Sequence, residues 1–313
     1  MGVPAASGYP QYSGSLINPM FSMDLLERFY TSTVYSDIST TEYSGELEKG
    51  GDQITFWREP EVMIRDAYKN KKIEHDTINA EPVTMIIDRA KEFSIKVSQI
   101  DEKQIQNWPK WKESFLKSAG YQLAQAIDPD LMDEMYTSVA AANQGANAGA
   151  QSASINLGVA GAPLVITAAN IIEVLSYIHQ VLDEAKAPRD GRFVILPPAG
   201  ITALRNSDLQ AAYMTGLSWS PLTNGRIPEE VMGFTIMQSL NIPSEVDATV
   251  TKLSYHLIAG VKMATAFAAQ LEKTRVIEDK DDWATYYQGL TVYGFKVLYP
   301  EALVHIYATF DAA

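Results

Sequence analysis

The chain contains 313 residues, 46% of them hydrophobic and 20% charged, which is ordinary for a globular protein that buries its core in one large domain or two smaller ones. Its net charge of −13 argues against broad binding to a nucleic-acid backbone, because such binding needs clustered lysine and arginine. The absence of cysteine excludes disulfides, thiolate metal sites and cysteine nucleophiles.

The N-terminal segment carries no targeting signal and predicts an arm. It lacks the basic and then hydrophobic pattern of a signal peptide, and no apolar run in the chain approaches the roughly 18 residues of a membrane span. We therefore expect a soluble protein that is made in the cytosol and contacts no membrane. Residues 2–19 are rich in glycine, proline, serine and tyrosine, which predicts an arm that orders against a partner. Ser22 is expected to cap a short amphipathic helix containing Leu25 and Phe29.

Residues 45–99 are predicted to form a long two-stranded arm that the rest of the chain cannot cover. The run 53–58 is rich in aromatic and β-branched residues, and the run 83–87, continuing through 93–97, is its natural return strand. A strand rises about 3.3 Å per residue, so a dozen residues reach about 40 Å. An isolated hairpin of that length is marginal in water and needs another surface to pack on.

Two interpretations of this arm remain open. It is either a charged surface hairpin lying on its own domain, or an arm that lies on a neighbouring copy of the same protein. The second interpretation predicts charge pairs with the neighbour from residues 58–82, because this part of the arm contains both charge signs. The candidate interface residues are Arg58, Arg65, Asp66, Lys69 and Glu74.

The middle of the chain is predicted to be helical. Apolar residues recur at helical spacing from about residue 102 to residue 143, which indicates one continuous apolar face. Pro109 is expected near a helix start, and the sequence Asp128-Pro129-Asp130 is interpreted as an ordinary break in the helix. A glycine-rich loop follows, and it lacks the Gly-Lys-Ser/Thr ending of a phosphate loop. Thr167 is then expected to cap a second amphipathic helix.

The last third of the chain supplies strands. The run 193–196 is short, apolar and bounded by glycine and proline, which suits a buried central strand. Residues 199–209 predict a short helix, and residues 224–227 predict a turn. Further strands are expected at 234–239, 255–260, 264–268, 290–298 and 302–310. Helices and strands in this order predict an α+β fold.

No catalytic constellation is found in the sequence. The four histidines, His75, His179, His256 and His305, are not at metal-ligand spacing and are interpreted as surface or packed side chains. The acidic cluster at 278–282 fits no calcium loop and is interpreted as a solvated turn. We therefore expect no catalytic residue, no metal, no cofactor and no enzymatic activity.

Three segments, in their order along the chain, resemble coat proteins of several phage groups. Residues 191–198 resemble the strand that opens the axial domain of these proteins. Residues 225–243 contain a glycine turn, the pair Gly233-Phe234 and an apolar residue before Pro243, and residues 282–300 resemble the closing strand. Over essentially its whole length the chain is similar to the tailed-phage major capsid protein of the Hong Kong 97-like fold.

The resemblance implies a division of the chain into five parts. These are an N-terminal arm (1–42), an extended two-stranded loop with adjoining peripheral strands (43–99), a peripheral domain with a long spine helix (100–189), an axial domain (190–285) and strands that return to the peripheral domain (286–313). Within the axial domain, the two runs 193–196 and 234–239 are expected to be buried and to pair in one sheet.

The same resemblance implies a major capsid protein that self-assembles into the icosahedral shell around a double-stranded DNA phage genome. The implied partners are copies of the chain in pentamers and hexamers, a portal and decoration proteins, with packaged DNA held only by non-specific proximity. The first predicted helix begins near residue 22, whereas some family members carry a long helical extension that acts as a scaffold. This difference implies a separate scaffolding protein. The expected location is the virion capsid, after synthesis in the bacterial host cytoplasm.

Two rival functions stay open at this point. The first is an encapsulin-like compartment, which shares the fold but encloses enzymes and would need a groove for cargo peptides. The second is an enzyme with a dispersed site, which would show a concave pocket lined by titratable groups with perturbed pKa values.

Overall fold

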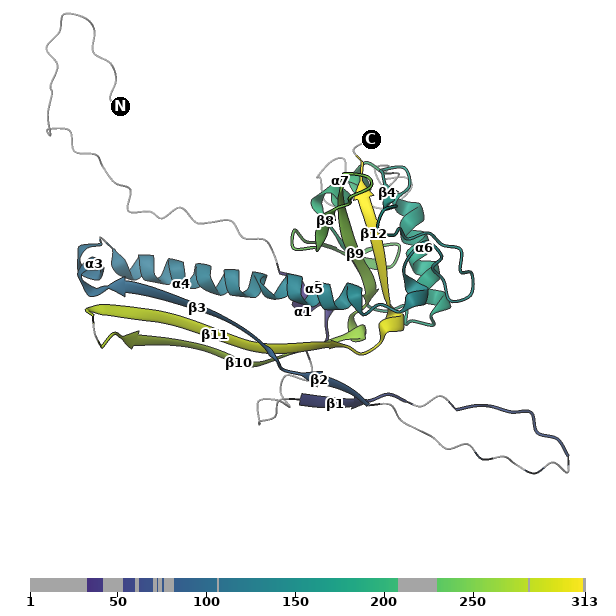
Figure 1. The fold of residues 1–313 in the computed structure, drawn as a ribbon, viewed down its shortest axis with the longest axis horizontal. Helices are drawn as coiled ribbons and strands as arrows, with labels where there is room; N and C mark the ends of the chain where they lie inside the picture. Colours follow the sequence, from purple (N-terminus) through teal and green to yellow (C-terminus); the bar gives the residue numbers. More distant parts are fainter. Residues whose placement is uncertain are drawn as a thin grey trace, which may run out of the picture.

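The computed structural model describes residues 33–41, 53–59, 62–69, 72, 75, 82–105, 107–207, 230–280 and 282–311. It consists of an elongated layer, a compact domain at one end of that layer, and an arm on the other side of the layer's sheet (Figure 1). The predicted N-terminal arm up to residue 32, the helix expected after Ser22, the residue Glu74 and the turn at 224–227 lie outside the described residues.

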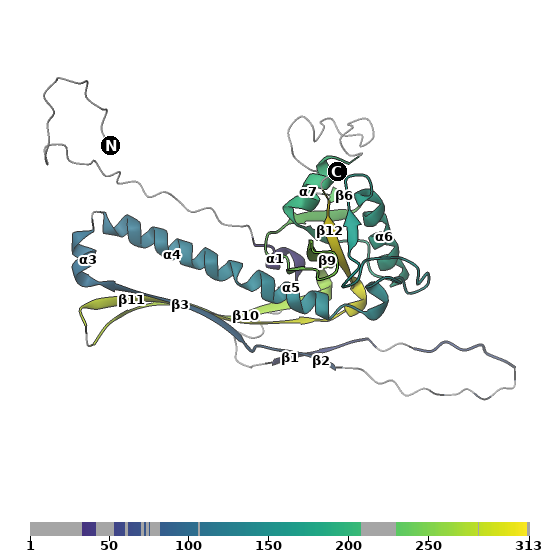
Figure 2. The same cartoon turned by 45° about the horizontal axis from the view of Figure 1, so that its top comes forward.

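The elongated layer is a three-stranded antiparallel sheet covered on one face by a long helix (Figures 1 and 2). The strand order is β10 (Thr265–Glu278), β11 (Ala284–Val297) and β3 (Arg89–Ser98). Helix α3 (Gln99–Gln104) follows β3, and α4 (Trp108–Gln125) then runs back along the sheet. At the tip, the predicted solvated acidic turn binds a lysine, because Lys96 Nζ lies 3.2 Å from Asp279 Oδ2 and 3.0 Å from Asp282 Oδ2.

The helical segment is divided as the prolines predict. Pro109 occupies the first turn of α4, where the missing N–H of proline costs no hydrogen bond. Helix α4 ends at Gln125 and α5 (Ile127–Thr137) begins two residues later, with Pro129 in its first turn. Helix α5 buries Leu131 and Met135 on one face, so the second half of the predicted apolar stripe is core.

The compact domain is built on a seven-stranded mixed sheet. Its strand order is β4, β12, β9, β5, β7 and β6, and β8 also pairs with β9. The strands span Leu164–Ile166 (β4), Arg192–Leu196 (β5), Glu230–Val231 (β6), Phe234–Gln238 (β7), Ser244–Val246 (β8), Leu253–Val261 (β9) and Leu303–Phe310 (β12). The helices are α6 (Ile171–Glu184) and α7 (Pro198–Arg205), with short 3₁₀ helices at Ala141–Asn143, Lys262–Ala264 and Pro300–Ala302.

The core of this domain lies around β5. All residues of β5 are buried, and β5 pairs in parallel with β7 and antiparallel with β9. The expectation that the runs 193–196 and 234–239 pair in one sheet is therefore confirmed, although β7 is only partly buried. Helix α6 buries an apolar stripe against the same core. It begins at Ile171 rather than at Thr167, with Asn170 as the residue before its first turn.

The arm begins as the two-stranded ribbon of β1 (Gln53–Trp57) and β2 (Pro82–Ile86), which pair antiparallel over five residues. The prediction that the run 93–97 continues the return strand is wrong, because these residues belong to β3 and pair with β11. Residues 87 and 88 separate β2 from β3, and β3 continues into the other sheet. Alternation along a strand defines its two faces, but it does not identify the strand's partner.

The strand pairing shows how the chain is distributed between the two bodies. Strand β4 and helix α6, which fall within 100–189, belong to the compact domain. Strand β10, which falls within 190–285, pairs with β11 in the elongated layer. Strand β12 returns to the compact domain, where it pairs with β9 and β4. The chain thus passes between the two bodies several times, and such long-range pairing is not encoded in local periodicity.

Candidate assembly surface

The root of the arm is held by an apolar contact with the elongated layer. In the β1–β2 ribbon one face carries Ile54, Phe56, Val83 and Met85, and Met85 is completely buried. These side chains pack against Ala266, Ala268 and Leu298, at the end of the elongated layer near the compact domain. The period-two alternation of the ribbon therefore explains why it lies flat on its own body at this point.

A glycine in β11 permits this close approach. A Cβ atom at Gly294 would collide with the backbone oxygen of Ile86 in β2. Because a backbone atom cannot move out of the way as a flexible side chain can, glycine is required if β2 is to lie this close to β11. Gly294 is therefore a positioning residue for the arm.

Arg58 fixes the point where the arm leaves the body. Its Nε donates to the backbone oxygen of Leu298 at 3.0 Å, and its Nη2 donates to the same oxygen. Nη2 also lies 3.3 Å from Glu301 Oε1, and the guanidinium lies over the ring of Tyr299, 5.2 Å from its centroid. Arg58 is thus bound to its own chain, where the sequence had suggested a contact with a neighbour.

Beyond Arg58 the described arm exposes large apolar side chains. Ile64 is 94% exposed, and Val62, Met63 and Tyr68 are each more than half exposed. On the solvent face of the ribbon, Trp57 is 69% exposed. We call Trp57, Val62, Met63, Ile64 and Tyr68 the apolar arm set. Full burial of a side chain of this size is favoured over exposure to water by about 1.5 to 3 kcal/mol.

The charged residues proposed from the sequence accompany this set. Asp66 and Lys69 are exposed, and Arg65 Nη2 lies 3.7 Å from the sulfur of Met63. The run Val62-Met63-Ile64 is not among the interface residues predicted from the sequence, which are all charged. That run was visible as three large apolar residues between acidic and basic ones, in a segment with no predicted core of its own.

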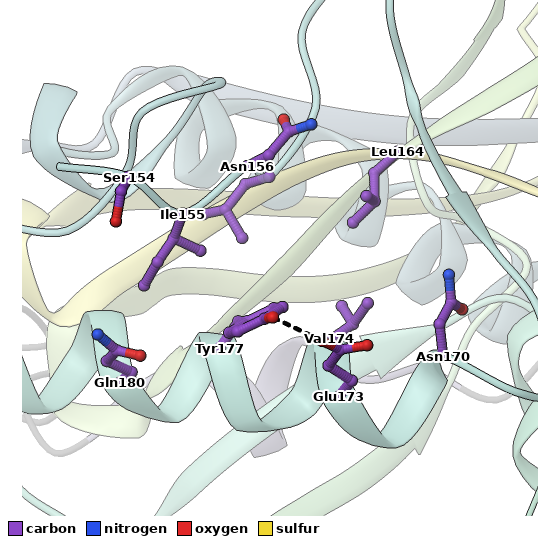
Figure 3. Close-up of a pocket in the computed structure, with 10 residues that line it drawn as sticks. Ser154, Ile155, Asn156, Leu164, Asn170, Glu173, Val174, Tyr177 and Gln180 are labelled. Carbon is purple, nitrogen blue, oxygen red and sulfur yellow. Dashed lines mark hydrogen bonds between the residues drawn. The ribbon is translucent and has the colours of Figure 1, made fainter. Parts of the chain in front are cut away.

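The groove along α6 is the first alternative site (Figure 3). Its cavity of about 420 Å³ lies between α6 and the segment that contains Ile155 and Leu164. The Tyr177 hydroxyl donates to Glu173 Oε1 at 2.6 Å, which raises the pKa of Tyr177. Gln180 donates to Glu184 at 2.9 Å. The side chains that would orient a ligand are engaged within the chain, so the groove is a poor candidate for catalysis.

A histidine pair is the second alternative. His256 Nδ1 lies 3.0 Å from His305 Nε2, and the ring of Tyr136 stacks on His256 with centroids 4.3 Å apart. Burial lowers the pKa of both histidines, that of His305 to about 4, so the pair is neutral at neutral pH. Among the described residues there is no group of three or more potential metal ligands. Nor does any helix in the described ranges have the length and apolar character needed to cross a membrane.

Comparisons with known proteins identify the architecture. No protein-family model and no curated protein matches the chain. Among solved structures, the chain is similar to one from Mycobacterium phage Che8, with 21% identity, a TM-score of 0.72, and coverage of 95% of this chain and 97% of that one. It is also similar to the capsid of cyanophage P-SCSP1u, with 14% identity, a TM-score of 0.70 and coverage of 95% and 94%. The mature capsid of bacteriophage PhiM1 matches with 13% identity, a TM-score of 0.67 and coverage of 94% and 92%.

The chain has the Hong Kong 97-like fold. The α+β fold class expected from the sequence is therefore confirmed. The expected long spine helix is α4. In this fold, the apolar arm set lies at the end of the β1–β2 ribbon and on the described residues just beyond it. Ile64, the most exposed large apolar side chain among the described residues, thus lies on the arm.

Proposed function

We propose that the chain is the major capsid protein of a tailed phage and self-assembles into the icosahedral shell around the phage's double-stranded DNA. The observation that carries this proposal is the apolar arm set on a loop that projects away from its own body. Such a loop is stable only against another surface, and a second copy provides one in every subunit of a lattice. The match to phage capsid structures over nearly the whole chain also supports this proposed function.

The arm is proposed to make a heterologous contact with the neighbouring copy. A contact of this kind repeats from subunit to subunit and closes into rings, which here are the pentamers and hexamers of a shell. Burial of the apolar arm set supplies most of the contact's free energy, because exposed charge pairs contribute only about 0 to 1 kcal/mol each. Arg65, Asp66, Lys69 and Glu74 are proposed to fix the register of the arm on its neighbour. Arg58 holds the arm's exit on its own body.

Within each ring, the compact domain is proposed to take the axial position and the elongated layer the peripheral one. The elongated layer is long and thin, so its sheet and α4 offer the extended edges that neighbouring rings need. The compact domain contains a broad sheet with β5 fully buried, which suits a body packed around a symmetry axis.

The proposed partners follow from this role. They are copies of the same chain, a separate scaffolding protein, a portal and decoration proteins. The net charge of −13 suits a wall that encloses DNA without binding it, because binding to phosphate needs clustered basic side chains. The protein is accordingly placed in the virion capsid after synthesis in the bacterial host cytoplasm, and no turnover of a substrate is expected.

The test is to replace residues 61–80 by a short Gly-Ser turn and to measure thermal melting and particle formation separately. We expect an unchanged melting temperature and the loss of closed particles in negative-stain micrographs. Normal particles from this variant would refute the arm contact. A well-behaved monomer of the unmodified chain, with and without a scaffold, would refute the capsid assignment itself.

Two point-variant sets separate apolar from charged contributions. The first changes Val62, Met63 and Ile64 to serine, and the second reverses the charges of Arg65, Asp66 and Lys69. We expect the serine set to prevent assembly, and the charge reversals to weaken it while the body stays folded. Purified particles that contain enzymes or peptide cargo and no DNA would favour the encapsulin-like alternative.

A further inference from the structure

Residues 33–41, which we call the strap, cross the junction between the elongated layer and the compact domain. Its one helical turn is α1 (Tyr35–Ile38), which lies beside α5 in both views (Figures 1 and 2). Ile38 is completely buried, and Val34 nearly so. Both belong to the main hydrophobic core, so the strap is an integral part of the interior.

One end of the strap is held by a buried carboxylate. Asp128, in the first turn of α5, is completely buried. Its side chain accepts hydrogen bonds from the backbone N–H of Val34 at 3.2 Å and from the backbone N–H of Tyr35 at 3.1 Å. A third donor is Nδ2 of Asn241, at 3.1 Å. Asp128 thus caps α1 from a distant part of the chain, a role that α1 does not fill with a side chain of its own.

The sequence interpretation of Asp128-Pro129-Asp130 as an ordinary helix break is therefore incomplete. Burying a carboxylate is costly unless hydrogen bonds compensate it, and Asp128 has three donors from two other segments. Periodicity identified the break correctly, but it could not show that the strap and Asn241 meet there, because both are far away in the chain.

The other end of the strap is joined to β10. The backbone N–H of Thr40 donates to Thr265 at 2.8 Å, and the backbone N–H of Phe267 donates to Thr40 at 3.0 Å. Thr40 Oγ1 also lies 3.3 Å from the oxygen of Lys262. The ring of Tyr35 contacts that of Phe267, with centroids 5.1 Å apart. Both ends of the strap are thus hydrogen-bonded, to different elements.

These elements belong to different bodies. Helix α4 packs on β3 and β11, in the elongated layer, whereas α5 packs on β9 and β12 of the compact domain as well as on β11. The joint between the two helices is Ala126, only two residues before Asp128. Asn241 follows β7 in the compact domain, while Phe267 lies in β10 of the elongated layer. The strap therefore spans the junction between the two bodies and is hydrogen-bonded on both sides of it.

We propose that the strap is a conformational clamp that sets the angle between the elongated layer and the compact domain, with Asp128 as its anchoring residue. Release of the strap from Asp128 frees α5 to rotate about the Ala126 joint while the sheets of both bodies stay intact. This role goes beyond the capsid function proposed above and does not depend on the arm contact.

The test measures the clamp and the angle separately. Because the chain has no cysteine, spin labels can be placed at Lys103→Cys in α3 and Ser176→Cys in α6, both exposed positions. Labelled chain is diluted into excess unlabelled chain, so that pulsed electron resonance reports only distances within one subunit. Hydrogen exchange at the amides of Val34 and Tyr35 reports on the strap. The variant is Asp128→Ala, with Asp128→Asn as a milder change of nearly equal volume.

We expect exchange of the two amides to become roughly tenfold faster or more in Asp128→Ala, as for the loss of a buried hydrogen bond, together with a broader and shifted distance distribution. The matched control is Asp133→Ala, an exposed aspartate on the same helix, which should change neither. Faster exchange with an unchanged distance distribution would overturn the proposal, and so would unchanged exchange. If the alanine variant does not fold, Asp128→Asn decides by the same two measurements.

Discussion

The guanidinium of Arg192 and the carboxylate of Asp183 form an ion pair in which only the carboxylate reaches solvent. Arg192 Nη2 lies 2.6 Å from Asp183 Oδ1, and the arginine side chain is 0% exposed. The remaining donors of Arg192 bond to the backbone oxygens of Pro188 and Ala187, both at 2.9 Å, and to His179 Nδ1 at 2.6 Å. Arg192 thereby joins the end of α6 to the start of β5 and lowers the pKa of Asp183.

Removal of this arginine is expected to be severely destabilising. Arg192→Met should lower the free energy of unfolding by about 3 kcal/mol, because it removes the fully buried partner of the ion pair and leaves partly buried carbonyl groups without a donor. The control is Arg189→Met, since Arg189 is bound to the same carboxylate at 3.1 Å but is 81% exposed. That change should cost less than about 1 kcal/mol. Equal losses in the two variants, measured by chemical unfolding, would contradict the role assigned to Arg192.

The close contact between β2 and β11 at the root of the arm depends on the absence of a side chain at Gly294. Gly294→Ala should lower the free energy of unfolding by about 1 to 3 kcal/mol or displace β2 from β11, because the added Cβ meets the backbone of Ile86. Gly120→Ala is the opposite case, since Gly120 lies in α4 with no atom near the added Cβ, and alanine should stabilise that helix by about 1 kcal/mol. Thermal melting should show a lower melting temperature for Gly294→Ala and a higher one for Gly120→Ala. Faster oxidation of Met85 would show that β2 has moved away from the elongated layer. A stabilised Gly294→Ala variant would rule out the close contact.

Local patterns in the sequence predicted the elements well, and their pairing poorly. The run 193–196 could be recognised as a central strand because its composition and its bounding glycine and proline are local features. The partner of 93–97 could not be predicted, because β11 is almost two hundred residues away and several strands have the same alternation. The role of Asp128 could not be predicted for the same reason, because its partners lie 93 to 113 residues away. The partners of Arg192 are at most 13 residues away, but the local sequence pattern does not show that its side chain is buried among them.

Glu184 is expected to hold the glycine-rich loop against α6. Its Oε2 accepts from the backbone N–H of Gln151 at 2.8 Å and of Ser152 at 3.0 Å, and these bonds lower the pKa of Glu184 to about 2. Because the folded pKa lies below the ordinary value of 4.5, this contribution is complete above pH 4.5 and is lost as the pH falls toward 2. Glu184→Gln should therefore raise exchange of both amides at neutral pH.

The control for this prediction is Glu173→Gln, an exposed position on the same helix that bonds to Tyr177. It should leave protection of Gln151 and Ser152 unchanged. Protection factors, which correct for the intrinsic effect of pH on exchange, should also fall in the unmodified chain between pH 4.5 and 2. Protection that is insensitive to both acid and Glu184→Gln would show that the loop is held by other contacts.

The histidine pair predicts an acid-sensitive compact domain. Burial, together with the neighbouring His256, lowers the pKa of His305 from 6.5 to about 4, so the folded chain keeps this ring neutral where the unfolded chain protonates it. Stability is therefore lost as the pH falls from about 7 toward 4, and the loss between pH 7 and 5 is about 2 kcal/mol. Asp133 and Glu245 face the pair and raise the pKa of His256 in part, but burial of the ring is the larger effect.

His305→Gln should reduce this loss, because glutamine can still bond to His256 but does not titrate. The measurement is the free energy of urea unfolding at pH 7 and at pH 5, in the unmodified chain and in the variant. All other titrating groups are common to both proteins and cancel in the difference. His75→Gln, at an exposed position, should retain the full pH dependence. A variant that loses as much stability between pH 7 and 5 as the unmodified chain would mean that His305 is protonated in the folded protein, and that the imidazole pair is not the source of the acid sensitivity.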